Sequence, residues 1–223
     1  MPPTELRRRD IPDATVARLS AYLHVLEAMA DRGEESTSSE ALATAAGVQS
    51  AKVRKDLSYL GTCGVRGVGY DVGRLAVHIA RELGLAKDWP VVIVGMGNLG
   101  RALAGSGGLT ARGFTLVGGV DHDPEVIGSE VGGIVVAPMS ALPDLVAAGH
   151  PIGVIATPSA AAQEAADALI AAGVPAILNF AGGSLITPET VDVRHVDIAG
   201  ELRILAFRAQ RRAAETVWSE VAR

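Results

Sequence analysis

The first part of the chain carries apolar residues at the spacing of an amphipathic helix. Val16, Leu19, Leu23, Leu26 and Met29 recur every three or four residues, so they share one face of a helix that ends near Gly33. A helix with a single apolar stripe has to pack against other elements. The pattern therefore predicts the first helix of a small helical domain.

Two more helices follow at short intervals. A run of hydroxyl residues at 37–39 precedes Glu40, which is typical of a helix start, and this helix stops at Gly47. The next helix begins around residues 49–50 and turns its apolar residues inward. These residues are Val53, Leu57 and Leu60. A helix, a tight glycine turn and a second helix make a helix-turn-helix, whose second helix enters the DNA major groove.

Residues 61–70 fit a β-hairpin better than a helix, because Val65 and Val68 are interleaved with four glycines. A hairpin that follows a helix-turn-helix is the wing of a winged-helix domain. Arg66 lies within it, where a cation can reach phosphates or a narrow minor groove.

Beyond residue 86, short β-branched runs alternate with alanine-rich helical stretches. The predicted strands are residues 89–94, 114–120, 134–136, 152–156, 176–180 and 193–198, and the predicted helices include 139–148 and 160–172. Such alternation is typical of a doubly wound parallel sheet. The fold class is therefore α/β, with an N-terminal winged-helix domain followed by a Rossmann-like doubly wound parallel sheet.

The chain ends in a long amphipathic segment. From residue 200 to 223 apolar residues alternate with arginines, which predicts a single terminal helix. It either packs on its own sheet or crosses to a second subunit. The predicted domains are thus 1–85 for the winged helix, 86–199 for the sheet and 200–223 for the terminal helix.

The loop after the first strand of the second domain has the GxGxxG spacing of a dinucleotide-binding turn. Its residues are Gly95, Met96, Gly97, Asn98, Leu99 and Gly100. The glycines allow the tight turn, the close approach of a pyrophosphate and the packing of helix on strand. Asp121 ends the second strand, 21 residues past the last glycine, where an acid holds the adenosine ribose hydroxyls. Its charge would repel a 2′-phosphate, so NAD+ and NADH are the predicted cofactors.

Ligands bind such sheets at the carboxyl ends of the strands. Two later strands end in polar or aromatic segments that we expect to line the nicotinamide half of the site. These residues are Thr157, Pro158, Asn179, Phe180 and Ala181.

The charge distribution changes how the first domain is interpreted. The whole chain of 223 residues has a net charge of -5, which by itself argues against nucleic acid. Residues 1–85, however, hold eleven bases and eleven acids, and within 48–81 six bases face two acids. We therefore predict DNA contacts from the third helix and the wing. The candidates are Gln49, Ser50, Lys52, Arg54, Lys55, Ser58, Tyr59 and Arg66.

The sequence shows no recognisable cluster of catalytic residues. The five histidines lie apart from any recognisable acid or base cluster, and about a hundred residues of Rossmann sheet leave no separate substrate domain. A binding and regulatory protein is favoured. Two alternatives stay open: a small NAD-dependent oxidoreductase with an N-terminal partner-binding domain, and a CoA-binding or other nucleotide-binding module, to which residues 153–158 are similar.

The single cysteine, Cys63, excludes an internal disulfide and a multi-cysteine metal site, and no metal is predicted. No apolar run is long enough to span a bilayer, and the N-terminal arginines have no apolar stretch behind them. The expected compartment is the cytoplasm, with no membrane partner.

Several long motifs resemble one family, the redox-sensing transcriptional repressor Rex. They are residues 53–61 (VRKDLSYLG), 66–72 (RGVGYDV), 92–100 (VIVGMGNLG), 177–181 (ILNFA) and 196–198 (VDI) followed by Glu201 and Leu202. The similarity extends from about residue 13 to 212, nearly the whole chain.

The resemblance implies a homodimer with a swapped C-terminal helix, bound to an inverted-repeat DNA operator and released when NADH rises. It also implies that Arg18 and Asp197 take part in the switch, together with a tyrosine of the helix after the glycine loop. That position is Ser106 here, so we expect weaker discrimination between NADH and NAD+. Cys63 and Gly182 also depart from the usual residues of the family.

Overall fold

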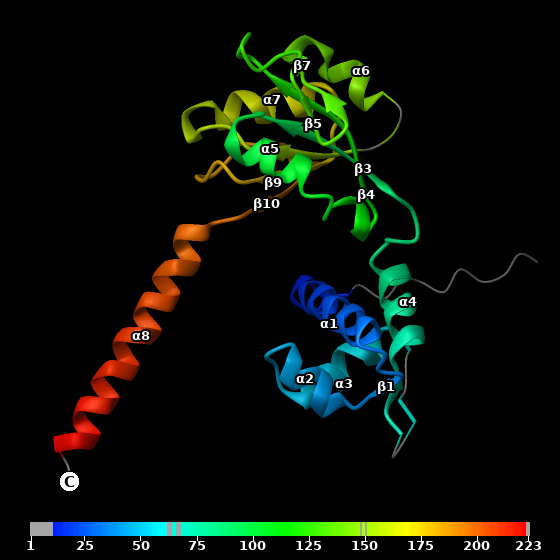
Figure 1. Cartoon of the computed structure of the whole chain (residues 1–223), viewed down its shortest axis with the longest axis vertical. Coiled ribbons are helices and arrows are strands. Elements are labelled where there is room, and N and C mark those ends of the chain that lie inside the picture. Colours follow the sequence, from blue (N-terminus) through cyan, green and yellow to red (C-terminus); the bar gives the residue numbers. More distant parts are fainter. Residues whose placement is uncertain (1–10, 62–63, 66–67, 148, 150, 222–223) are drawn as a thin grey trace, which may run out of the picture. The chain divides into compact units, whose positions relative to one another are not determined.

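The computed structural model describes residues 11–61, 64–65, 68–147, 149 and 151–221. The chain divides into two compact units, Met1–Lys87 and Asp88–Arg223 (Figure 1).

The N-terminal unit is a bundle of four helices with a short antiparallel strand pair. The helices are α1 (Asp13–Asp31), α2 (Ser39–Ala45), α3 (Ser50–Tyr59) and α4 (Val72–Glu82), and β1 (Ser36–Thr37) pairs with β2 (Tyr70–Asp71). Their apolar faces meet in one core. Its fully buried large side chains are Leu19, Tyr22, Leu26, Leu42, Leu57 and Ile79.

The buried stripe of α1 differs in part from the predicted one. Val16 is 39% exposed, whereas Thr15 and Tyr22 are buried beside the expected leucines. The difference arises because Thr15 and Tyr22 hydrogen-bond a buried carboxylate on α3, a partner that an apolar periodicity cannot reveal. The buried face of α1 is therefore partly polar.

The helix-turn-helix forms as expected. The Ser38 hydroxyl caps α2 by accepting a 3.0 Å hydrogen bond from the Ala41 amide. Gly47 ends the turn with a φ of +68°, a conformation that favours glycine. This turn places α3 against α2.

The wing begins after α3. Val65 bridges Gly69 in antiparallel fashion, and the chain then enters β2, which pairs with β1. Gly69 has a φ of +93°, and a Cβ there would collide with the Thr37 carbonyl oxygen. The proposed DNA contact Arg66 and the lone Cys63 lie outside the described residues.

The second unit contains six parallel strands in the order β10-β9-β8-β3-β4-β7. They are β3 (Trp89–Val94), β4 (Phe114–Asp121), β7 (Ala137–Pro138), β8 (Ile152–Ile155), β9 (Ala176–Asn179) and β10 (Asp192–His195). In chain order this is the Rossmann arrangement 3-2-1-4-5-6. The order reverses between β3 and β8, where such sheets bind ligands.

One predicted strand is misplaced. Residues 134–136 do not enter the main sheet; β6 (Ile134–Val135) pairs with β5 (Glu130–Val131) in a separate antiparallel hairpin. The third strand of the Rossmann half is instead the short β7. A β-branched run indicates strand but not the sheet that the strand joins, which explains the error.

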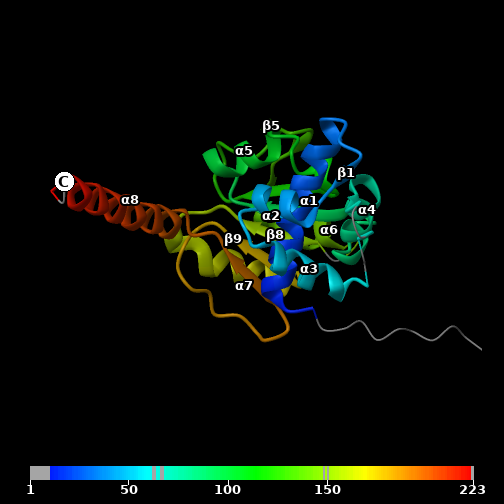
Figure 2. The same ribbon diagram turned by 90° about the horizontal axis from the view of Figure 1, so that it is seen from below.

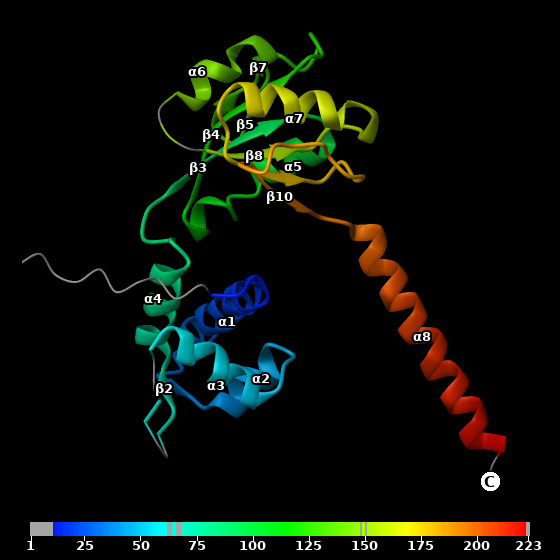
Figure 3. The same ribbon diagram turned by 180° about the vertical axis from the view of Figure 1, so that it is seen from behind.

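Helices cover both faces of the sheet (Figures 1 and 3). α5 (Asn98–Gly105) lies on one face, and α6 (Leu142–Val146) and α7 (Ala162–Ala171) lie on the other. Three short 3₁₀ turns, Thr110–Arg112, Met139–Ala141 and Ser159–Ala161, join these elements. α6 and α7 are therefore shorter than the predicted 139–148 and 160–172.

The last helix, α8 (Ile198–Val221), starts two residues before the prediction and extends as one continuous helix (Figure 2). Ile198, Leu202 and Leu205 lie on one side of it, and Ile204 and Phe207 lie on the other. All five side chains are 46–63% exposed in the single chain. Among the described residues, nothing covers either of these apolar sides of α8.

Candidate functional sites

The glycine loop between β3 and α5 is shaped by backbone packing. Gly95 has a φ of +93°, and a Cβ there would lie 2.9 Å from the backbone of Ala156 and Thr157 at the end of β8. At Gly100 a Cβ would collide with the Gly95 carbonyl oxygen. These two glycines let the loop close tightly at the point where the strand order reverses.

Gly97 differs from the other two glycines because its Cα faces open space. A Cβ built there meets nothing within 4 Å, and Gly97, Asn98 and Leu99 are all exposed. No side chain caps the first turn of α5, so its amides are available to an anion. The loop thus has room for a phosphate at the position that the motif predicts.

Asp121 ends β4 and holds the loop from one side. Its carboxylate is buried and accepts hydrogen bonds from the Met96 amide at 2.7 Å and from the amides of His122 and Asp123 at 2.7 and 3.0 Å. Burial acts to raise the pKa of Asp121, but the three amide hydrogen bonds outweigh it and leave the pKa below its usual value. The group stays ionised and retains acceptor capacity for a hydroxyl.

Arg101 also holds the loop, a contact that the sequence reasoning missed. Its Nε donates to the Met96 carbonyl at 3.0 Å, and its Nη2 donates to the Ser129 hydroxyl at 3.1 Å. Met96 is fully buried, and its side chain belongs to the core beneath the loop. An arginine directly after the third glycine was the available signal.

A small cavity of about 200 Å³ lies at the carboxyl edge of the sheet and includes the predicted Thr157. Its other lining residues are Val94, His122, Met139, Ala161, Glu164 and Ala165. The Thr157 hydroxyl is buried, and among the described residues nothing hydrogen-bonds it. An unsatisfied buried hydroxyl is uncommon, so this atom suits a ligand. With the open Gly97 and the ionised Asp121, the residues present fit a dinucleotide.

The predicted nicotinamide residues lie further along the same edge. Asn179 is fully buried, and its Oδ1 accepts from the Ala181 amide at 2.9 Å while its Nδ2 contacts His195 Nδ1 at 3.1 Å. The Asn179 amide thus holds the turn that follows it and contacts the neighbouring strand β10. Pro158 is exposed, and Phe180 and Ala181 are half-buried.

In the N-terminal unit, α3 presents a cationic face. Lys52, Lys55 and Ser58 are exposed, Gln49 is exposed at the N-cap, and Ser50 and Tyr59 are half-buried. Arg54 is also exposed, but it already has partners. Its Nη1 lies 3.0 Å from Glu40 Oε1 and donates to the Ser39 hydroxyl at 3.0 Å. The two lysines are thus the α3 cations for which no ion pair appears among the described residues.

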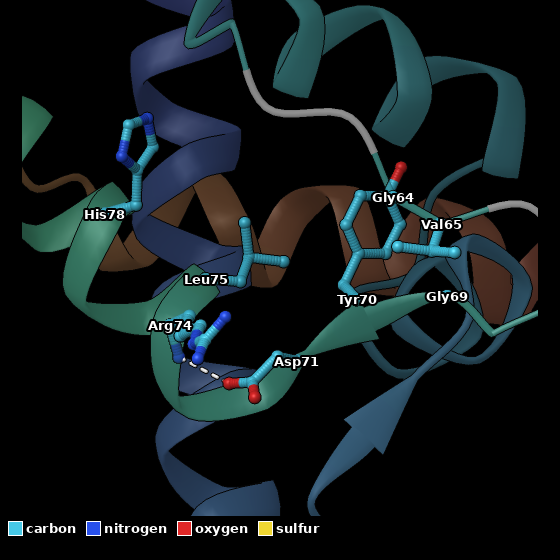
Figure 4. Close-up of a pocket in the computed structure, with 8 residues that line it drawn as sticks. All are labelled: Gly64, Val65, Gly69, Tyr70, Asp71, Arg74, Leu75 and His78. Atoms are coloured by element: carbon cyan, nitrogen blue, oxygen red, sulfur yellow. Dashed lines mark hydrogen bonds between the residues drawn. The ribbon is translucent and has the colours of Figure 1, made fainter.

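The base of the wing packs on α4 around a cavity of about 300 Å³ (Figure 4). Asp71 caps α4 by accepting from the Arg74 amide at 2.7 Å, and a Cβ on Gly64 would lie 3.0 Å from the Tyr70 ring. His78 Nε2 lies 3.0 Å from the Leu60 carbonyl oxygen at the end of α3. These contacts tie the wing and α4 to the end of α3.

A buried charge network joins α3 to α1. Asp56 is buried, and its carboxylate is held by Arg18, whose Nε and Nη2 lie 2.6 and 2.7 Å from its two oxygens. The Tyr22 hydroxyl donates to it at 2.9 Å and the Thr15 hydroxyl at 3.1 Å. Asp56 was not among the candidates, although its position between Val53 and Leu57 on the apolar face of α3 could have indicated it.

The network shifts the pKa values of its members. Burial acts to raise the pKa of Asp56, but hydrogen bonds from Arg18, Tyr22 and Thr15 keep it below its usual value. Burial and the hydrogen bond to Asp56 raise the pKa of Tyr22 to about 12. The hydrogen bond to Asp56 also raises the pKa of Arg18. The carboxylate and the guanidinium are therefore both charged at neutral pH.

The other two proposed switch residues have local roles. Asp197 caps α8 by accepting a 2.8 Å hydrogen bond from the Gly200 amide. Ser106 ends α5, is exposed, and donates to the Leu103 carbonyl at 3.1 Å. Their part in a switch stays a prediction.

A different family model matches a segment of each unit. Residues 10–58 match the family described as "Putative DNA-binding protein N-terminus", and residues 86–183 match the CoA binding domain. A redox-sensing transcriptional repressor Rex from Streptomyces coelicolor is 57% identical over 210 residues, which is 94% of this chain and 81% of that protein. The chain belongs to the Rex family. The predicted resemblance is thereby confirmed.

Other members agree over nearly the full length. The Rex proteins of Streptomyces avermitilis and Desulfitobacterium hafniense are 55% and 47% identical over 96% and 92% of this chain, covering 85% and 98% of theirs. These Rex relatives are named transcriptional repressors rather than enzymes, which confirms the predicted regulatory class.

Two solved structures of RSP, a Rex-family repressor, have the same fold. The complex with β-NAD+ and operator DNA is 30% identical, with a TM-score of 0.83 over 95% of this chain and 98% of that one. The complex with β-NADH is 29% identical, with the same TM-score over 93% and 98%. The predicted α/β fold class is confirmed. Among the described residues, no helix of this Rex-family chain is long and apolar enough to cross a membrane.

Proposed function

We propose that this protein is a repressor that binds operator DNA through its N-terminal unit and is released from it when NADH binds the C-terminal unit. The observation that carries the proposal is the pairing, in one Rex-family chain, of a cationic α3 face with an open dinucleotide loop. RSP has been solved with NADH and with NAD+ and operator DNA, which supports this assignment.

The residues that would hold the cofactor follow from the geometry. Gly97 and the amides of the first turn of α5 would bind the pyrophosphate, and Asp121 would accept the adenosine ribose hydroxyls. Thr157 and the turn after Asn179 would line the rest of the site. NADH and NAD+ differ at the nicotinamide by one charge and by ring planarity, and this is the difference that the protein has to sense.

A fixed carboxylate at Asp121 favours a free ribose diol over a 2′-phosphate or the 3′-phosphate of coenzyme A. The match to a CoA binding domain nevertheless makes coenzyme A the appropriate competitor. NAD(H) should bind in its presence, whereas displacement of NADH by coenzyme A would favour the alternative ligand.

The proposed assembly is a homodimer formed through α8. Apolar side chains on two sides of this helix, among them Leu205 and Phe207, suit a helix enclosed by a second copy better than one lying on a single surface. Two copies of α3 would then read the two halves of an inverted-repeat operator. Cytoplasmic location follows from such a role on DNA.

Replacing Lys52 with alanine tests the assignment of α3. Loss of one phosphate contact should weaken binding to an operator duplex and lower the slope of log affinity against log salt by about 1 per subunit. Fluorescence anisotropy at several salt concentrations measures both. Lys87→Ala, which removes an exposed lysine outside α3, is the matched control. Unchanged affinity in the Lys52 variant would refute the groove assignment.

Ser106 is expected to weaken the distinction between the two cofactors. The resemblance to the Rex family implies a tyrosine in the switch at this position, whereas the Ser106 hydroxyl donates to a carbonyl of its own helix. Calorimetric titration with NADH and with NAD+ should show a smaller preference in the wild-type protein than in Ser106→Tyr. A large preference for NADH that survives Ser106→Ala would contradict this expectation.

A further inference from the structure

The orientation of α3 decides what its exposed residues can reach. Lys52, Lys55 and Ser58 are exposed, whereas Asp56 is buried together with Val53 and Leu57, the residues by which α3 packs on the rest of the unit. Because side chains project from a helix in fixed directions, a rotation of α3 about its axis would move all three exposed residues together. The contacts that fix this rotation therefore also fix which α3 side chains face the DNA.

The apolar contacts of α3 select the side that faces the core, but they include no directional bond. Val53 and Leu57 are fully buried, but apolar burial has no preferred direction. The bonds to Asp56 are directional: a two-pronged guanidinium contact from Arg18 and hydroxyl contacts from Tyr22 and Thr15. All three partners lie on successive turns of α1, so the carboxylate is tied to α1 at several points.

A buried ion pair is a poor source of stability, since apolar residues of similar volume often pack as well. We therefore expect the Asp56–Arg18 pair to affect the orientation of α3 more than the stability of the unit. We propose that Asp56 is a positioning residue for DNA reading, whose carboxylate, clamped by Arg18 and Tyr22, fixes the rotation of α3 on α1. This inference rests on the proposed function, because it assumes that α3 reads the operator.

The same geometry makes Arg18 the accessible part of the clamp. Its side chain is 25% exposed, whereas that of Asp56 is 2% exposed. A group that drew the guanidinium away would leave the Asp56 carboxylate buried without its cation, which is strongly unfavourable. α3 would then move to relieve it, so the orientation of α3 depends on Arg18.

The test compares specific and non-specific DNA binding. The full chain carrying Asp56→Asn is measured by anisotropy, without NADH, on an inverted-repeat duplex selected from a random library by the wild-type protein and on a scrambled duplex. Glu27→Gln, an equal charge change on the exposed side of α1, is the control. Circular dichroism reports folding.

Affinity for the selected duplex should fall at least about tenfold, because a misoriented α3 loses base contacts. Affinity for the scrambled duplex should stay within about twofold, because Lys52 and Lys55 still attract phosphates. Equal losses on both duplexes, or no loss, would overturn the proposal. Failure of the wild-type protein to select any duplex would instead contradict the proposed function.

A milder variant covers the case in which Asp56→Asn does not fold. Tyr22→Phe removes one hydrogen bond to the carboxylate and keeps the ring. The ratio of specific to non-specific affinity should then fall about threefold. It should fall further in Arg18→Lys, which keeps the positive charge but loses the two-pronged guanidinium contact. An unchanged ratio in both variants would overturn the proposal.

Discussion

Replacing Gly97 with alanine is expected to lower the affinity for NADH at least about tenfold, which corresponds to about 1.4 kcal/mol. A methyl group at this position meets no protein atom within 4 Å, so the fold should be retained. It would, however, occupy the space through which a pyrophosphate approaches the first turn of α5. Isothermal titration calorimetry measures the loss.

Gly105→Ala is the matched control for this variant. It adds the same methyl group at the far end of α5, also with no neighbour within 4 Å. NADH affinity should be unchanged there, and operator binding without NADH should survive in both variants. Normal NADH affinity in Gly97→Ala would place the cofactor away from the glycine loop.

Placing an aspartate at Leu205 is expected to convert the protein to a monomer and to weaken operator binding at least about a hundredfold. Leu205 is 58% exposed in the single chain, so the substitution leaves the unit that carries it intact. A charge buried between two copies would be costly. Sedimentation gives the oligomeric state, and anisotropy gives the affinity.

Gln210→Asp introduces the same charge at an exposed polar position of α8 and serves as the control. It should remain dimeric and bind operator normally. A Leu205→Asp protein that stays dimeric would show that α8 is not the interface. A monomer with full operator affinity would show that dimerisation is not needed for binding.

The local sequence pattern was sufficient to predict the glycine loop. The GxGxxG spacing and Asp121 are close in sequence to the strands that place them. The glycine loop lies where the strand order reverses, and Asp121 bonds it from the end of the neighbouring strand β4. The helix-turn-helix was predictable for the same reason, since its cap at Ser38 and its turn at Gly47 are local signals.

Contacts between distant residues could not be predicted in this way. Asp56 bonds Arg18 across 38 positions, and the network replaces Val16 with Thr15 in the buried stripe of α1. The pairing of residues 134–135 with β5 rather than with the main sheet likewise depends on tertiary context. Hydrophobic periodicity records which side of an element is buried but not what it is buried against.

The most direct test of the account is operator binding at a fixed total concentration of NAD+ and NADH while the NADH fraction is raised. A ligand shifts a two-state equilibrium only by its differential affinity for the two states. The account predicts full binding of an inverted-repeat duplex in NAD+ and progressive release as NADH replaces it. Occupancy that does not change across the whole range, with both cofactors shown to bind, would contradict it.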